Sequence, residues 1–126
     1  MTRNGFNKFC AALPATTHVV QWGGAEVWKV GGKVFAIGWF ERGHHPGITF
    51  KVSGFAYDVL RDAPGLRPAP YLASRGLKWI QSYDQPGLSD RDLMHYLKES
   101  HRIVALGLTK KARRGLGLEG LETDGA

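Results

Sequence analysis

The residue types that could hold a metal ion are dispersed along this sequence. Five histidines occur, but His44 and His45 are adjacent and His95 and His101 are six positions apart, which places them poorly on one helical face. The single cysteine, Cys10, excludes a zinc site built from thiolates, and neither an HExxH motif nor an Asp-rich calcium loop is present. We therefore expect no bound metal ion.

Nucleophilic catalysis also has no signature in the sequence. There is no GxSxG elbow, and the Ser, His and Asp residues fall at no diagnostic spacing. The glycines between positions 31 and 54 form neither a Walker motif nor a dinucleotide fingerprint, and turns and a narrow strand surface explain them better. These observations predict a protein that is not an enzyme and that carries no cofactor.

Basic residues interleaved with aromatic ones are the pattern that remains. Lys and Arg total 17 against 11 Asp and Glu, and the resulting charge of +6 favours anionic partners such as nucleic acid. The cations would contact phosphates, and an aromatic ring would either stack on a base or pack in the core, which is the better supported role for most of the tryptophans. The candidate nucleic-acid-binding residues are Lys29, Lys51, Arg67, Arg75, Lys78 and Trp79.

The stretch from Glu26 to Val52 positions two of these candidates, because it is typical of three consecutive antiparallel strands. Gly31 and Gly32 separate its first two segments, and such a pair favours a tight hairpin because glycine tolerates positive φ. The implied register predicts one bulky and one narrow face of the hairpin. The bulky face holds Trp28, Phe35, Ile37 and Trp39, and the narrow face holds Val27, Lys29, Val34, Ala36 and Gly38.

The third strand, Gly47–Val52, follows a polar loop from Glu41 to Gly47 that we expect to project like a wing. Along this strand, apolar residues alternate with Thr49 and Lys51. If the apolar set faces the core, Lys51 shares the outer face with Lys29. Both cations would then lie on a surface that is open to a partner.

Helices are expected to cover the other side of this sheet. A first helix runs from Thr2 or Asn4 to about Leu13, and a short one spans Ser53–Asp62. A long helix begins at Ser89, which resembles a capping box with Asp92, and continues through about Leu108, with an extension into Lys110–Arg114. Phe6, Phe9, Cys10 and Leu13 share one stripe of the first helix, and Phe55, Val59 and Leu60 are expected to face inward from the second.

The segment between the short and the long helix is irregular. Pro68 and Pro70 exclude a long helix or a central strand from Leu66 to Leu77, whereas Lys78–Tyr83 is rich in aromatic and β-branched residues and predicts a further strand. At 126 residues the chain is expected to form a single domain over residues 1–114, with a flexible, glycine-rich tail at 115–126. One cysteine and no long apolar run predict a cytoplasmic location away from membranes.

Taken together, these segments resemble the MmcQ/YjbR family over about Phe6 to Arg114. The resemblance is carried by the VGGKVFA hairpin, by Lys51 at the end of GITFKV, by RPAPYLASRGLKWI, and by LSDRDLMHYLKESHRIVALGLTKKAR. It implies an α+β fold in which helices pack on an antiparallel sheet, similar to the frataxin-like arrangement, and DNA binding through a double wing. The family offers no catalytic residues to carry over, and the scattered acidic residues here do not favour the iron handling associated with the frataxin-like fold.

Three functional hypotheses follow. The first is a non-enzymatic protein that contacts the DNA phosphate backbone through a basic sheet and wing surface. The second is a domain that binds a small anionic ligand or a protein, with a pocket between the sheet and segment 66–80, where Arg67, Arg75 and Lys78 would select the anion. The third is an interaction domain or homodimer that uses an exposed aromatic patch.

Overall fold

A computed structural model describes residues 1–70, 72 and 77–120 of the chain. These residues form an antiparallel sheet of six strands in the order β1-β2-β3-β4-β6-β5, together with helices at the N-terminus, in the middle and near the C-terminus. The predicted α+β class is confirmed. The strands are β1 (Thr16–Gln21), β2 (Ala25–Val30), β3 (Lys33–Trp39), β4 (Gly47–Lys51), β5 (Leu66–Pro68) and β6 (Trp79–Ser82). The helices are α1 (Arg3–Ala12), α2 (Gly54–Leu60), α3 (Asp90–Leu106) and α4 (Lys110–Gly115).

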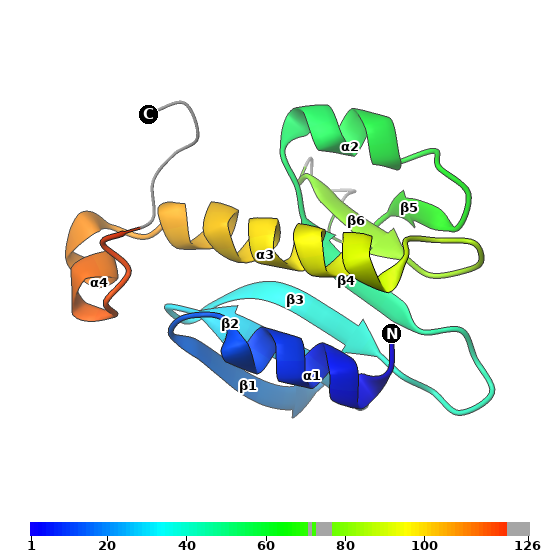
Figure 1. Ribbon diagram of the computed structural model, residues 1–126, viewed down its shortest axis with the longest axis horizontal. Coiled ribbons are helices and arrows are strands. Elements are labelled where there is room, and N and C mark those ends of the chain that lie inside the picture. The colour runs from blue at the N-terminus through cyan, green and yellow to red at the C-terminus, as the bar shows by residue number, and fades with distance from the viewer. Residues whose placement is uncertain (71, 73–76, 121–126) are drawn as a thin grey trace.

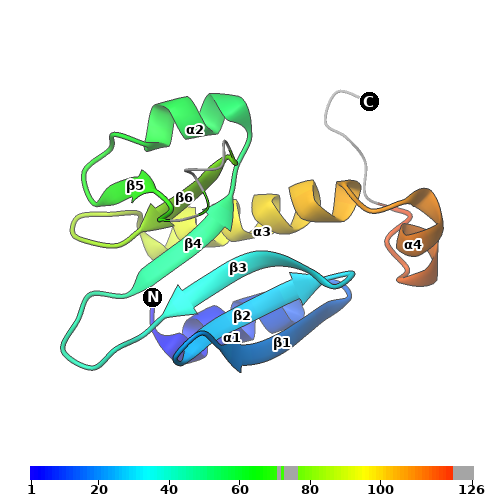
Figure 2. The same cartoon turned by 180° about the vertical axis from the view of Figure 1, so that it is seen from behind.

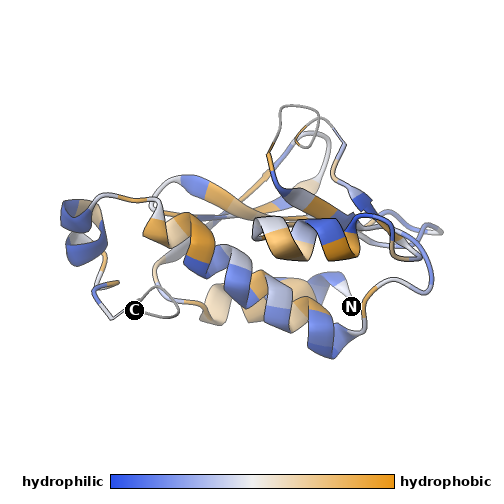
Figure 3. Ribbon diagram, turned by 90° about the horizontal axis from the view of Figure 1, so that it is seen from above, coloured by the Kyte–Doolittle hydropathy of each residue, from blue (hydrophilic) through white to orange (hydrophobic). Residues whose placement is uncertain are grey.

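The sheet has one face covered by helices and one face free of them. Helices α1 and α3 lie side by side across the sheet in Figure 1, and the view from above shows both on the same side of the strands (Figure 3). From behind, the strands stand in front of both helices (Figure 2). We call the side that carries α1 and α3 the helix face and the opposite side the outer face.

Polar side chains begin each helix as its sequence predicts. The hydroxyl groups of Thr2, Ser53 and Ser89 each accept a hydrogen bond from a backbone N–H in the first turn of α1, α2 and α3. The expected extension of α3 is a separate element. Helix α3 ends at Leu106, with Gly107 as its C-cap, and the Thr109 hydroxyl caps α4.

The main core lies between the helix face of the sheet and α1 and α3. Phe6 and Cys10 are both fully buried there, as the spacing in the first helix predicts. Burial raises the pKa of the Cys10 thiol far above its usual value, so the residue behaves as an apolar side chain. Helix α3 contributes Leu93, Leu97 and Val104 to the same core.

A β-bulge in the central hairpin overturns the predicted assignment of its faces. Trp28 pairs with Ala36 while Lys29 pairs with Val34, so Phe35 is an extra residue on β3. The extra residue moves every later side chain of β3 to the opposite face from the one expected. Ala36 and Gly38 therefore face the helices. Ile37 and Trp39, which were predicted to share a face with Trp28, instead pack on the outer face beside Val27.

A buried hydroxyl supports this bulge from the long helix. Ser100 of α3 is fully buried, and its Oγ donates a hydrogen bond to the Phe35 carbonyl at 2.6 Å. The same oxygen accepts a bond from the Lys51 N–H at 2.8 Å. The pairing of β3 with β4 stops at Ala36 and Phe50. Ser100 therefore bridges the two residues that would form the next pair, Phe35 and Lys51.

The prediction for the short helix is wrong for Phe55 and Val59 and right for Leu60. Phe55 and Val59 were expected to face inward, yet Phe55 is 82% exposed and Val59 is 59% exposed. Tyr57 and Leu60 are the residues of α2 that are buried. Because α2 makes only two turns, its apolar residues occupy both sides, and the spacing could not decide which side would face the sheet.

The first residues after α4 pack against the core. Within the predicted flexible tail 115–126, Leu118 is buried in the main core and its backbone N–H bonds to the Arg113 carbonyl at 2.8 Å. Residues 121–126 lie outside the described part of the chain. The boundary proposed at residue 114 stays a prediction.

Candidate ligand cavity on the outer face

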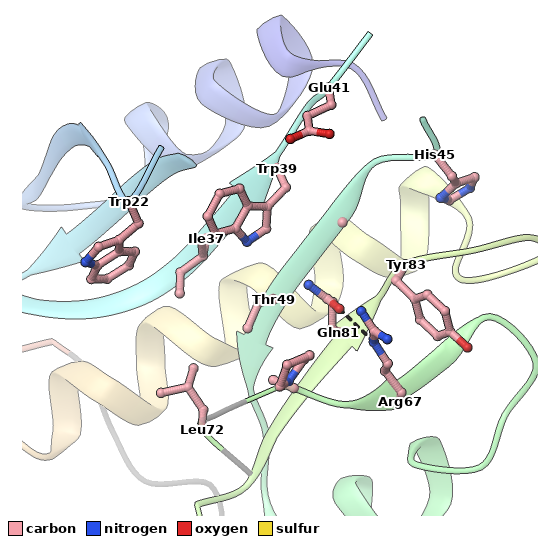
Figure 4. A pocket seen from close by; sticks show the side chains of 13 residues that line it. Trp22, Ile37, Trp39, Glu41, His45, Thr49, Arg67, Leu72, Gln81 and Tyr83 are labelled. Carbon is pink, nitrogen blue, oxygen red and sulfur yellow. Dashed lines mark hydrogen bonds between the residues drawn. The ribbon is translucent and has the colours of Figure 1, made fainter. Parts of the chain in front are cut away.

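A cavity of about 670 Å³ opens on the outer face, where no helix covers the sheet. Its floor crosses four neighbouring strands, because Ile37 belongs to β3, Thr49 to β4, Gln81 to β6 and Arg67 to β5. The volume lies in the range of cavities that hold small organic molecules. The described lining residues divide into an apolar and a polar group at opposite ends (Figure 4).

The apolar end lies over β3. Ile37 and Trp39 rise from this strand, and Trp22 and Leu72 flank them (Figure 4). Both residues of β3 reach the outer face only because of the bulge at Phe35. Trp22 is 54% exposed although it is one of the largest apolar side chains of the protein.

The polar end is built around Arg67 of the short edge strand β5. Its Nε donates a hydrogen bond to Gln81 Oε1 at 2.9 Å, and its guanidinium carbon lies 4.0 Å from the centre of the Tyr83 ring. The bond sets the plane of the guanidinium, and the ring covers one side of it. Within the described residues, the two terminal nitrogens Nη1 and Nη2 have no hydrogen-bond acceptor, so this fork can receive an anion.

The loop between β3 and β4 supplies the rim of the cavity. Glu41 and His45 both line the opening from this loop. The His45 Nδ1 lies 2.9 Å from the Pro46 carbonyl oxygen. Since a carbonyl oxygen only accepts hydrogen bonds, Nδ1 is the donor in this contact.

The structure separates the candidate residues predicted downstream of β4. Arg67 lines the cavity, but Lys78 places its Nζ 4.7 Å from the centre of the Tyr57 ring of α2. Trp79 pairs with Lys51 and is only 7% exposed, so its indole is a packing group rather than an open stacking surface. Arg75 lies outside the described residues.

The two lysines of the central strands share the outer face, as their register implies. Lys29 pairs with Val34, which packs on the outer face, and Lys51 is two residues from Thr49 of the cavity floor. Both are partly exposed, and neither lines the cavity. Lys29 on β2 and Lys51 on β4 are two strand spacings apart, roughly 10 Å.

A second polar cluster lies on the helix face, away from the cavity. Glu26 is buried, accepts a hydrogen bond from Asn7 at 2.8 Å, and lies 3.4 Å from His18. Asn7 in turn accepts a bond from the Trp28 indole at 2.9 Å. These contacts satisfy buried polar atoms and join α1 to β1 and β2, so they account for the cluster as a structural one.

Sequence reasoning missed Gln81, Tyr83 and Trp22 as parts of the cavity. Gln81 is 14 positions from Arg67, and the pairing of β5 with β6 brings the two together. A usable signal existed for Trp22, because a tryptophan followed by two glycines marks an aromatic side chain at a turn. In the described residues, no group of three or more His, Cys, Asp and Glu is arranged to hold a metal ion.

This chain is similar to known proteins in both its sequence and its fold. The sequence model of the YjbR family matches residues 11–103, which is well over half of the chain. The chain belongs to the YjbR family. A crystal structure of Deinococcus radiodurans protein DR2400, whose domain is described as DUF419, is similar to this family member with a TM-score of 0.79. The alignment covers 97% of this chain and 95% of that one at 22% identity, which establishes a shared fold.

A comparison of this chain with curated proteins gave no match. Within the residues that the structure describes, none of the helices has the length and apolar character needed to cross a membrane.

Proposed function

We propose that this YjbR-family protein binds a small anionic ligand in the cavity of the outer face. The observation that carries the proposal is the fixed geometry of Arg67, whose guanidinium is oriented by Gln81 and covered by Tyr83 inside a concave site. An arginine held in this way loses little side-chain freedom when it binds. Its terminal N–H groups, which have no acceptor among the described residues, match the paired oxygens of a carboxylate or phosphate.

Arg67 lies at the border of the sheet. Its strand, β5, has three residues and is the last strand in the sheet order, so Arg67 stands at one end of the cavity. Arg67 is exposed, so an anion can reach its guanidinium from solvent, and the apolar surface lies within the same cavity. One ligand can therefore use both the charge and the apolar surface.

Binding of simple anions tests the proposal. Amide and arginine Nε signals would be followed by NMR while acetate or inorganic phosphate is added at constant ionic strength. The expected result is a saturable change at Arg67 and in β5 and β6, with the change lost in Arg67→Gln. Arg91→Gln is the matched control, since Arg91 is exposed on α3 across the sheet. The proposal fails if Arg67→Gln responds like the unaltered protein.

DNA binding through phosphate contacts is the second candidate function. The charge of +6 and the common outer face of Lys29 and Lys51 support it, because cations on one strand surface can contact the phosphates of a DNA backbone. The wing loop from Glu41 to Gly47 lies beside the same face of the sheet.

A duplex titration at several salt concentrations tests this second candidate. Affinity should fall roughly tenfold or more between about 50 and 200 mM salt if several phosphates are contacted. Lys29→Gln and Lys51→Gln should each weaken binding and reduce the salt dependence, whereas Arg91→Gln should change neither. Absence of duplex binding at low salt would exclude this function.

A further inference from the structure

We infer that the ligand of the outer-face cavity is a monoanion with a rigid, apolar ring body, of the size of a bicyclic aromatic carboxylate. This inference rests on the proposed function, because it specifies the ligand of the same cavity. Three features of the cavity support it: the separation of its two ends, the aromatic surface at the apolar end, and the balance of charge along its lining.

The separation of the ends sets the length of the ligand. Ile37 lies on β3 and Arg67 on β5, and β4 and β6 stand between these strands. Three strand spacings separate the two backbones by about 14 Å, and the Arg67 side chain covers part of this distance by reaching Gln81 on β6. An acetate or phosphate ion held by Arg67 would leave the apolar end unfilled. A single ring with its acid group covers only part of that distance, whereas two fused rings reach from the guanidinium toward Ile37 and Trp39.

The aromatic surface sets the shape of the ligand body. Trp22 and Trp39 present indole rings to the apolar end (Figure 4), and indole prefers offset or edge-to-face contact with another flat ring. Trp22 also has a positive φ of 53°, a backbone conformation that large side chains rarely adopt. Its side chain remains 54% exposed, so burial in this chain does not explain a tryptophan at that turn. Contact with a ligand does.

The charges along the lining set the charge of the ligand. Arg67 is the cation among the described lining residues, and Glu41 places a carboxylate at the rim of the same cavity. A single negative charge is matched by Arg67. A polyphosphate would bring further charges toward Glu41 without additional described cations to receive them.

The test compares four probes on the full chain by NMR titration at constant ionic strength. The probes are naphthoate, the neutral naphthamide of the same shape, acetate and inorganic phosphate. Naphthoate should bind at least about tenfold more tightly than acetate or phosphate, since two fused rings bury apolar area that these ions lack. The affinity for naphthoate should also exceed that for naphthamide by about tenfold, because only the carboxylate forms the charge-assisted pair with Arg67.

Two variants assign these differences to the two ends of the cavity. Arg67→Gln should weaken the binding of naphthoate by about tenfold and leave the affinity for naphthamide within about twofold of that of the unaltered protein. Trp22→Ala should weaken naphthoate and naphthamide alike and leave phosphate unchanged, and the exposure of Trp22 makes this variant safe for folding. Arg91→Gln should change none of the four probes.

The outcomes separate this inference from the proposed function. If acetate and phosphate bind through Arg67 but naphthoate binds no more tightly, the inference is wrong and the proposed function stands. If no probe depends on Arg67, both are wrong. If naphthoate and naphthamide bind equally and Trp22→Ala affects both, the cavity takes neutral rings, and the charge assigned to the ligand is wrong.

Discussion

Replacing Ser100 with alanine removes a single oxygen that two strands share. Its Oγ donates to the Phe35 carbonyl and accepts from the Lys51 N–H, at 2.6 and 2.8 Å. The side chain is fully buried. Alanine fits the same space, so the change deletes two hydrogen bonds without crowding. The space vacated by one oxygen is too small to admit a water molecule between its neighbours.

The cost of this change follows from the two groups left without partners. An unsatisfied buried donor or acceptor costs about 1–3 kcal/mol, so losing partners for the Phe35 carbonyl and the Lys51 N–H should cost roughly 2–6 kcal/mol of unfolding free energy. A domain of this kind is commonly stable by about 5–15 kcal/mol, so the loss is large. The shift in midpoint temperature equals this loss divided by the unfolding entropy, which scales with chain length. For 126 residues the midpoint should fall by on the order of 10 °C.

Urea unfolding followed by tryptophan fluorescence measures this loss directly. The midpoint should fall while the slope stays constant, because the folded and unfolded surfaces are the same in both proteins. Ser89→Ala is the matched control. It removes the same hydroxyl from an exposed helix cap, where the expected cost is about 1 kcal/mol. If Ser100→Ala costs no more than Ser89→Ala, the bridge does not hold β3 and β4 together as argued.

Three further predictions concern stability. Burial lowers the pKa of His101, although its hydrogen bond to the Pro14 carbonyl acts in the opposite direction. Below pH 6.5 the unfolded chain therefore binds more protons than the folded one, and the free energy of unfolding should decline as the pH falls. His101→Gln should flatten that part of a stability curve recorded against pH, and an unaltered curve would contradict the assignment. Gly65→Ala should lower the thermal midpoint markedly, since φ is +81° and a Cβ would clash with the Asp84 carbonyl, whereas Gly54→Ala, with open space around it, serves as its control. Phe55→Ser should change the unfolding free energy by less than about 0.5 kcal/mol, because the ring is exposed, and a cost above about 2 kcal/mol would show that it is packed.

Local patterns in the sequence predicted the elements that depend on neighbouring residues. The turn at Gly31 and Gly32 forms as expected, with Val30 paired to Lys33. Ser53 and Ser89 cap their helices, and the apolar stripe of α3 is buried from Leu93 onward. In each case the signal and the structure involve residues within a few positions of one another. The family resemblance supplied the α+β arrangement that joins these elements.

The cavity could be predicted only in part. Arg67 was identified as a candidate cation, and segment 66–80 was proposed as one wall of a pocket, but the partners that orient Arg67 were not identified. Gln81 and Tyr83 meet Arg67 through the pairing of β5 with β6. Lys78 was grouped with Arg67, yet it contacts Tyr57, because side-chain direction depends on where α2 lies.

The sequence by itself determined the central hairpin, the third strand and the starts of α1, α2 and α3, since hydrophobic spacing, capping hydroxyls and paired glycines act over short distances. The tertiary structure alone decided which face each residue of β3 occupies. An extra residue at Phe35 reverses those faces, and its carbonyl is satisfied by Ser100, 65 positions away. No local pattern reports a partner that distant. The bulge delivers Ile37 and Trp39 to the outer face, where the cavity lies.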